Sequence, residues 1–189
     1  NDRYIHRYTA QLDSLAPGSN YAYQVGSTEK GIWTEFNNFQ TEAVNTEHFT
    51  YVWFGDTHCF PDSGKLVNLA ADKNKDAVFY SIAGDNVSTG LYRDDWDKLF
   101  QYGGRTFANR PLMPVLGNHD RQDGLGAQLY YDLFSLPKNG PAAVDPEASY
   151  SFEYGNALFI MIDATSEVDD HTAWIEEKLK NTNATWKFV

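Results

Sequence analysis

The sequence is poor in sulfur and has no long apolar run. Of its 189 residues, one is cysteine and two are methionine. The single thiol, on Cys59, excludes a disulfide within the chain. No stretch approaches the roughly 18 consecutive apolar residues of a membrane span, and the polar start Asn1-Asp2-Arg3-Tyr4 has no signal-peptide pattern. We therefore expect no membrane span, and the start without methionine indicates a processed or excised piece.

Positive charge is also scarce. The chain has 15 Lys and Arg residues against 26 Asp and Glu residues, a formal net charge of −11 at pH 7. A nucleic acid or a membrane surface held by charge needs clustered Lys and Arg, so we expect neither as a partner. Hydrophobic residues make up 42% and aromatic residues 15% of the chain. This composition favours a packed, aromatic-rich globular protein over a disordered one.

Residues 1 to 44 predict a β-meander without a helix. The expected strands cover residues 4–12, 21–25 and 33–40, with turn sequences between them. The spacing of Leu15, Pro17 and Tyr21 is typical of a tyrosine corner, in which a tyrosine hydroxyl bonds to the upstream backbone of a β-sandwich. The segment resembles the last strands of a fibronectin type III-like domain. About three strands fit where a whole sandwich has about seven, so we expect only its C-terminal part.

From residue 45 to 189, apolar runs alternate with helical stretches. Strands are expected at 49–54, 77–83, 112–116 and 157–162, and helices at 64–75, 92–108 and 171–180. A last apolar run at 186–189 predicts the beginning of another strand. The β-α-β order predicts an α/β layered fold, which begins near residue 45.

Three of the expected strands end in a polar cluster that begins with glycine. The clusters are Gly55-Asp56-Thr57-His58, Gly84-Asp85-Asn86 and Gly117-Asn118-His119-Asp120. In an open α/β sheet the ligand crevice lies beyond the carboxyl ends of the strands, so we expect the clusters to face one space. Asp, His and Asn supply the oxygen and nitrogen ligands that suit Mn, Fe or Zn. Two such ions about 3.5–4 Å apart can clamp a phosphoryl group and activate water, which points to phosphoester chemistry.

In this order and at strand ends, the three clusters resemble the first three motifs of the calcineurin-like metallophosphoesterases, over about residues 47 to 189. The resemblance implies a metal-dependent hydrolase that acts on phosphate-ester small molecules and uses two divalent or trivalent ions (Mn, Fe or Zn). By motif position, it implies that Asp56 and His58 bind the first ion, that Asp85 bridges both, and that Asn118 binds the second. The choice between a phosphomonoester, a diester and a nucleotide stays open.

The same resemblance implies roles close to the substrate. His119 is expected beside the phosphate, together with Asn118, as a transition-state stabiliser or general acid. Asp120 is expected next to it in a supporting catalytic role. Arg121 can reach a phosphate oxygen from its place after Asp120, and a solvated loop charge is the alternative.

A β-sandwich before the catalytic domain resembles the layout of purple acid phosphatases. That subfamily keeps a tyrosine ligand shortly after the Asp of the second motif and lacks the His of the first. Here Asp85 is followed by Asn86-Val87-Ser88-Thr89-Gly90, and His58 is present. The colour that a bond between tyrosine and iron gives is therefore not expected. The layout implies a secreted, periplasmic or cell-surface protein.

The later ligands of this family, a histidine and a closing Gly-His-x-His, have no counterpart in the sequence. His171, the only histidine after His119, falls in an expected helix and is a poor substitute. We therefore expect an incomplete fragment with under-occupied metal sites and weak or no activity. The alternative from another class is a non-catalytic surface or adhesion module with a degenerate phosphoesterase fold. The sequence leaves the oligomeric state open.

Overall fold

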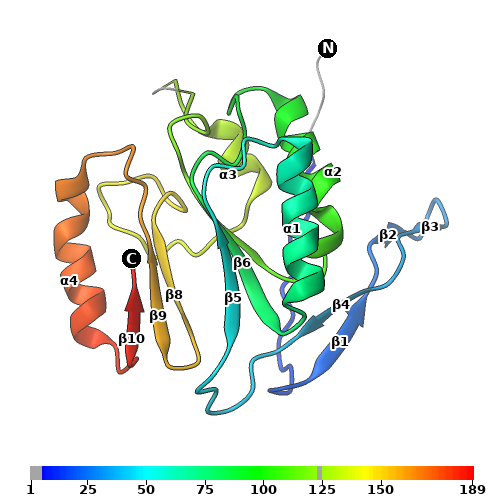
Figure 1. Cartoon of the computed structure of the whole chain (residues 1–189), viewed down its shortest axis with the longest axis horizontal. Helices are drawn as coiled ribbons and strands as arrows, with labels where there is room; N and C mark the ends of the chain where they lie inside the picture. Colours follow the sequence, from blue (N-terminus) through cyan, green and yellow to red (C-terminus); the bar gives the residue numbers. More distant parts are fainter. Residues whose placement is uncertain (1–5, 123–124) are drawn as a thin grey trace.

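The chain folds into layers, with two sheets between two sets of helices (Figure 1). This computed structural model describes residues 6–122 and 125–189. Helices α1 and α2 lie on one side of the first sheet, and the two sheets face each other. Helix α4 covers the outer side of the second sheet. This arrangement confirms the α/β layered fold that the sequence predicts.

The first sheet is parallel and has the strand order β5-β6-β7. Its strands are β5 (Thr50–Phe54), β6 (Ala77–Ala83) and β7 (Leu112–Val115), and the intervening helices are α1 (Pro61–Lys73) and α2 (Arg93–Phe107). Because all three strands run in the same direction, their carboxyl ends lie at one edge of the sheet. β6 is the middle strand, and each of its residues is buried or half-buried, as expected for a strand covered on both faces.

The second sheet has the order β10-β9-β8, in which β8 and β9 are antiparallel and β10 is parallel to β9. Its elements are β8 (Tyr150–Tyr154), β9 (Ala157–Met161) and β10 (Trp186–Phe188), preceded by α3 (Gln128–Leu133) and accompanied by the 3-10 helix η1 (Val168–His171) and α4 (Thr172–Asn181). Strand β8 was not expected from the sequence. Its alternating apolar and polar residues, followed by Gly155 with φ 56°, are nevertheless a hairpin signal.

Aromatic side chains fill the space between the two sheets. The rings of Phe79 and Phe159 lie edge to face with centroids 5.1 Å apart, and Tyr51 stacks on Phe79 at the same distance. A second core on the helical side of the first sheet contains Trp96 and Tyr130, both fully buried. These two cores account for much of the aromatic content of the chain.

All the helices and strands expected in residues 45–189 are present, whereas α3, β8 and η1 were not expected. Helix α1 begins at Pro61 rather than at residue 64, because proline has no N–H to satisfy and fits the first turn of a helix. Of the other expected elements, the strand at 77–83 has the observed bounds, and the rest differ from the observed ones by one residue at one or both ends. Among the described residues, no helix combines the length and the apolar character that crossing a membrane requires.

The N-terminal region forms two short antiparallel pairs, which we call the N-terminal strands. β1 (Asn20–Tyr23) pairs with β4 (Asn37–Gln40), and β2 (Gly26–Ser27) pairs with β3 (Ile32–Trp33). The expected strand at 4–12 is wrong for residues 6–12, which have no regular structure, and residues 4 and 5 lie outside the described part. Arg7 donates hydrogen bonds to the carbonyls of Tyr131 and Phe134 at the end of α3, so a helix holds this segment rather than a strand.

The hydrogen bond of the expected tyrosine corner is present. The Ala16 N–H donates to the hydroxyl oxygen of Tyr21 at 2.8 Å. The expected strand at 33–40 is interrupted, because residues 34–36 lie between β3 and β4 and are not paired as a strand. The assignment of this region to a fibronectin type III-like sandwich, and the boundary at residue 44, stay predictions.

Candidate metal centre

Three loops meet at the carboxyl edge of the first sheet. They cover residues 55–60, 84–92 and 116–122, follow β5, β6 and β7, and are called the edge loops below. They carry the three clusters that begin with glycine. Because β6 is the middle strand, the loop that follows it lies between the other two. Asp85, in this middle loop, is therefore placed where groups from both neighbouring loops can reach its two carboxylate oxygens.

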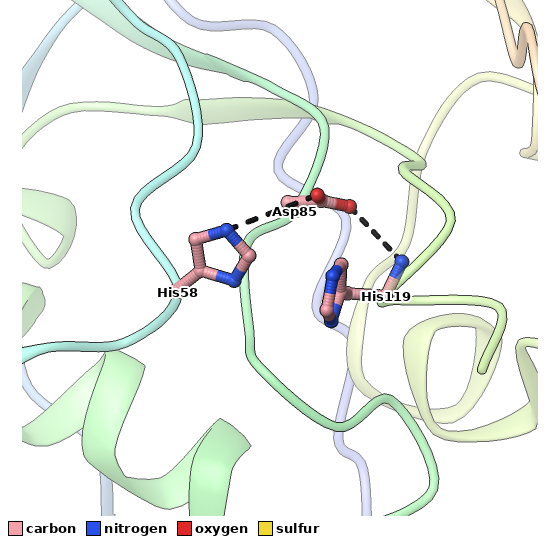
Figure 2. Close-up of side chains that lie close together, drawn as sticks. All are labelled: His58, Asp85 and His119. Atoms are coloured by element: carbon pink, nitrogen blue, oxygen red, sulfur yellow. Dashed lines mark hydrogen bonds and ion pairs between the residues drawn. The ribbon is translucent and has the colours of Figure 1, made fainter. Parts of the chain in front are cut away.

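His58, Asp85 and His119 form a group of potential metal ligands, one from each edge loop (Figure 2). Within the described residues, their ligand atoms all lie within 4.8 Å of one another. His58 Nε2 is 3.9 Å from Asp85 Oδ2, and the backbone N–H of His119 donates to Asp85 Oδ1 at 3.0 Å. The two imidazole rings meet edge to face with centroids 4.8 Å apart. Two imidazoles and one carboxylate thus face one small space.

The backbone near this group takes left-handed conformations at residues other than glycine. φ is 48° at His58, 53° at Cys59 and 49° at Asp85. Each such residue costs of the order of 1 kcal/mol and persists only where its surroundings fix it. Here the His58 N–H donates to the Asp85 carbonyl at 2.9 Å, which ties two of the strained residues together. Clustered strain of this kind is typical of functional sites.

A hydrogen bond of the His119 ring fixes its tautomer. Nδ1 lies 2.8 Å from the carbonyl oxygen of Ser88. Because a carbonyl only accepts hydrogen bonds, Nδ1 carries the hydrogen. In the neutral ring the other nitrogen, Nε2, then carries no hydrogen, and an imidazole nitrogen in that state has the chemistry to bind a metal ion or take up a proton. Either role is therefore open to His119.

Asp56 and Asn118 lie beside this group rather than within it. Both are exposed, and Asp56 lies outside the group whose ligand atoms are within 4.8 Å of one another. The two residues line a cavity of about 670 Å³ together with Asp85, Arg121 and Thr165. The structure thus brings the side chains of Asp56, Asp85 and Asn118, expected from three separate motifs, to the wall of one cavity.

Asp120 is fully buried and joins two of the edge loops. Its carboxylate accepts hydrogen bonds from the N–H groups of Gly117 at 3.0 Å, Asn86 at 3.2 Å and Val87 at 3.1 Å, and from the Asn86 amide at 2.9 Å. Burial raises the pKa of the Asp120 carboxyl, and these hydrogen bonds offset only part of that increase. Because its hydrogen bonds reach both loops, the side chain holds the loops after β6 and β7 in one arrangement.

Arg121 is not a freely solvated loop charge. Its side chain is 18% exposed, and its Nε and Nη2 donate to Asp163 Oδ2 at 3.0 Å and 2.6 Å. Asp163 follows β9 and is fully buried. Burial tends to lower the pKa of Arg121, but the hydrogen bonds and charge of Asp163 leave it raised, so the guanidinium stays charged. Arg121 also lines the cavity that contains Asp85.

Two residues of the site were not found by sequence reasoning. Ser88 contributes its backbone carbonyl, and every residue has one, so its sequence position carries no signal. Thr165 lines the cavity from the loop after β9. It belongs to none of the three motifs, and only the packing of the second sheet against the first brings it to the site.

His171 and Cys59 have structural surroundings. His171 is fully buried, and its ring nitrogens lie 2.8 Å from Ser149 Oγ and 3.2 Å from the Glu167 carbonyl oxygen. The ring thus supports the loop after β9 and, as expected, is no substitute for a metal ligand in the group described above. Burial is the largest influence on Cys59 and raises the pKa of its thiol, as for a small buried side chain.

The donor set of the edge loops fits a divalent metal ion. Imidazole nitrogen and carboxylate oxygen are common ligands of Zn, Mn and Fe, and none of these ions requires a thiolate. The hydrogen bond from His119 Nδ1 to a backbone carbonyl is of the kind that orients metal-binding histidines.

The sequence of residues 49–188 matches the calcineurin-like phosphoesterase family. Two uncharacterized proteins from two strains of Mycobacterium tuberculosis are each 23% identical to the chain over an alignment of 181 positions. The match covers 81% of this chain and 32% of each relative. The chain thus spans about a third of the length of the curated relatives it matches.

A solved structure has a similar fold. It is a purple acid phosphatase isolated from yellow lupin (Lupinus luteus) seeds, which is 19% identical to this chain with a TM-score of 0.74. The match covers 93% of this chain and 36% of the lupin chain. At this identity the likeness concerns the fold alone.

Proposed function

Because the chain belongs to the calcineurin-like phosphoesterase family, we propose that its edge loops contribute to a two-metal centre that hydrolyses phosphate esters. The observation that carries the proposal is that His58 and Asp85, two of the proposed ligands, and His119, proposed to act beside them, have potential ligand atoms within 4.8 Å of one another at the carboxyl edge of a parallel sheet. The family implies divalent metal ions, and the donor set of this group suits them. The substrate is a small phosphate ester.

Four residues hold the ions in this proposal. Asp56 and His58, from the loop after β5, would bind the first ion, and Asn118, from the loop after β7, would bind the second. Asp85 would bridge the two, a role supported by its place in the loop after the middle strand and by its contacts on both sides, with His58 and with the His119 backbone. When bound, such a pair of ions neutralises charge on the phosphoryl group and makes water a better nucleophile.

His119 acts on the leaving group. Its Nδ1–H is held by the Ser88 carbonyl in both the neutral and the protonated ring, so Nε2 is the atom that gains or loses a proton. A protonated Nε2 can stabilise charge on the phosphate or donate its proton to the leaving oxygen. Asn118 and Arg121 contact phosphate oxygens from the wall of the same cavity. Asp120 acts through its hydrogen bonds to both loops, as a positioning residue.

We expect weak turnover from this chain alone. The proposed residues supply three ligands to the first ion and two to the second, and an incomplete ligand set lowers metal affinity steeply. The proposal also covers the activity and the substrate of a protein that has the full length of the curated relatives. Hydrolysis of an aryl phosphate by this chain with added Mn²⁺, at a rate typical of phosphatases, would contradict the expected weakness but not the reaction.

The metal role is tested by calorimetric titration of Mn²⁺ into the wild type and the Asp85→Asn variant. The amide keeps an oxygen for the His119 N–H but removes the charge, so we expect the Mn²⁺ affinity to fall about 100-fold. Asp72→Asn is a matched control, because Asp72 is an exposed carboxylate on α1 that pairs with Arg105. Equal affinity of the wild type and Asp85→Asn would overturn the assignment, and no binding by the wild type would favour the non-catalytic module instead.

A further inference from the structure

The ion pair between Arg121 and Asp163 joins the two sheets at the cavity. Arg121 belongs to the edge loop after β7 of the first sheet, and Asp163 follows β9 of the second sheet. One carboxylate oxygen, Oδ2, accepts from both Nε at 3.0 Å and Nη2 at 2.6 Å. Nη2 also donates to the Tyr131 hydroxyl at 3.3 Å and lies 3.5 Å from Asp145 Oδ2. The guanidinium is thus held on one side by three groups.

Asp163 is itself rigidly placed. Its other carboxylate oxygen, Oδ1, accepts from the N–H of Thr165 at 3.0 Å and from the Thr165 hydroxyl. Its backbone N–H donates to Ser149 Oγ at 2.8 Å. Every carboxylate oxygen therefore has two donors, and Asp163 cannot turn without breaking several hydrogen bonds.

The support of Asp163 continues to His171. The Glu167 carbonyl only accepts, so His171 Nδ1 carries the hydrogen, and Nε2 of the neutral ring accepts from the Ser149 hydroxyl. Ser149 in turn accepts from the Asp163 N–H. The chain of hydrogen bonds has one donor and one acceptor at each step, which fixes the position of Asp163 relative to β8 and η1.

One nitrogen of Arg121 takes no part in these hydrogen bonds. Nε and Nη2 are used by Asp163 and Tyr131, whereas Nη1 has no hydrogen-bond partner in residues 6–122 and 125–189. The same side chain lines the cavity with Asp85 and Asn118. A guanidinium held through two of its nitrogens can present the third, with two N–H groups, to an anionic oxygen.

We propose that Asp163 is a positioning residue that orients Arg121 so that Nη1 binds an oxyanion of the phosphate ester in this cavity. This role rests on the proposed phosphoesterase function and adds to it a contribution from the second sheet. A purely structural ion pair is the weaker explanation, because a buried pair often adds little net stability over apolar residues and this one lies at the wall of a cavity. The anion is thus bound between the edge loops and the guanidinium of Arg121, which Asp163 in the loop after β9 orients.

The test compares Arg121→Lys with the wild type. Lysine keeps a positive charge for Asp163, so the buried carboxylate stays paired, but a single ammonium cannot both pair with Asp163 and present a second nitrogen to the cavity. We expect the dissociation constant of inorganic phosphate, measured by calorimetry with and without saturating Mn²⁺, to rise about tenfold. The Mn²⁺ affinity stays within about twofold of the wild type, because neither side chain is a proposed ligand. Arg105→Lys, at an exposed pair with Asp72, is the matched control.

Asp163→Asn tests the positioning step separately. The amide turns a donor group or a weaker acceptor toward the guanidinium, so Arg121 stays present but loses its fixed orientation. We expect a smaller rise in the phosphate dissociation constant, of about threefold to tenfold, again with unchanged Mn²⁺ affinity. Circular dichroism checks that both variants are folded, and a folded Asp163→Asn protein that binds phosphate as tightly as the wild type would overturn the positioning role.

The outcomes separate this proposal from the proposed function. Mn²⁺ binding by the wild type together with equal phosphate affinity in the wild type and Arg121→Lys would overturn the anion contact and leave the metal centre standing. Phosphate binding that depends on Arg121 but not on Mn²⁺, in a chain that binds no Mn²⁺, would support the contact and contradict the metal centre. A wild type that binds no phosphate under either condition would falsify the proposal.

Discussion

The edge loops bury polar side chains, whereas the N-terminal strands expose apolar ones. In the edge loops, Asn86 and Asp120 are fully buried, and the Asn86 amide nitrogen and the Asp120 carboxylate form hydrogen bonds between the loops after β6 and β7, although Asn86 Oδ1 has no partner within the described residues. In and next to the N-terminal strands, apolar side chains are exposed, and Ile32, Trp33 and Phe36 are each more than half accessible. Tertiary contacts within residues 45–189 therefore hold the edge loops in place, whereas local hydrogen bonds do more to hold the N-terminal strands.

This difference has a consequence for function. A strained loop keeps its conformation only when buried partners over-determine it, and the edge loops have such partners. The N-terminal strands reach the rest of the chain through few groups, among them the Tyr23 hydroxyl, which donates to the Ala108 carbonyl at 2.6 Å, and the Asn38 N–H, which donates to Asn109 Oδ1 at 2.8 Å. We therefore expect substitutions in the edge loops to affect both stability and metal binding, and those in the N-terminal strands to affect neither strongly.

Asp120→Ala is expected to have the largest effect. It removes the acceptor of four hydrogen bonds, from three buried donors in Asn86 and Val87 and one part-buried donor in Gly117, and unsatisfied buried donors are costly. We expect the free energy of unfolding to fall by about 3–5 kcal/mol, measured by urea denaturation with tryptophan fluorescence. For Asp120→Asn, which keeps one oxygen, the free energy of unfolding should fall by about half as much.

The control for this variant is Asp72→Ala, which removes an exposed carboxylate from α1. It should leave the unfolding midpoint nearly unchanged. An Asp120→Ala protein as stable as Asp72→Ala would mean that the edge loops are not held by buried hydrogen bonds, and the comparison with the N-terminal strands would lose its basis.

Gly117→Ala is expected to have the next largest effect, directly at the candidate metal centre. A Cβ at this position would lie 2.1 Å from Asp85 Oδ1 and 2.3 Å from the Asp85 backbone nitrogen, so the loop after β6 must move. We expect a loss of about 1–3 kcal/mol in stability. Since Asp85 is displaced, the Mn²⁺ affinity measured by calorimetry should fall as well.

A matched glycine elsewhere should behave in the opposite way. Gly104 lies inside α2, and a Cβ there meets no atom within 4 Å. Gly104→Ala should raise stability by about 0.5–1 kcal/mol, because alanine is the better helix residue, and should leave Mn²⁺ binding unchanged. Loss of Mn²⁺ affinity in both variants would show that the effect of Gly117→Ala is not a local clash with Asp85.

Much of the fold and part of the site could be predicted from the sequence, for reasons that the residues make plain. The strand at 77–83 is a run of apolar residues buried on both faces, and its ends are marked by polar residues and by Gly84. The metal motifs were visible because each immediately follows such a strand, so its place in space follows from its place in the chain. For these motifs, the local sequence pattern predicts both the strand and the position of the residues that follow it.

The remaining features depend on contacts between distant residues. Arg121 and Asp163 are 42 positions apart and come from different sheets, so neither the pair nor the free Nη1 has a signal in the sequence. The expected strand at 4–12 has the right composition, but residues 6–12 find no pairing partner in the described chain, and Arg7 bonds to α3 instead. Strand formation depends on a partner as much as on propensity.

Tyr21→Phe is expected to have the smallest effect and tests the other side of the comparison. It removes the hydroxyl that accepts from the Ala16 N–H at 2.8 Å and leaves the ring, which stacks on Phe39 with centroids 5.4 Å apart. We expect a loss of about 1 kcal/mol or less, seen as faster hydrogen exchange of the Ala16 amide. Tyr8→Phe, at a highly exposed tyrosine, is the control. Since the edge loops are held by contacts of their own, the Mn²⁺ affinity should not change, and a fall in that affinity would show that the two regions are coupled.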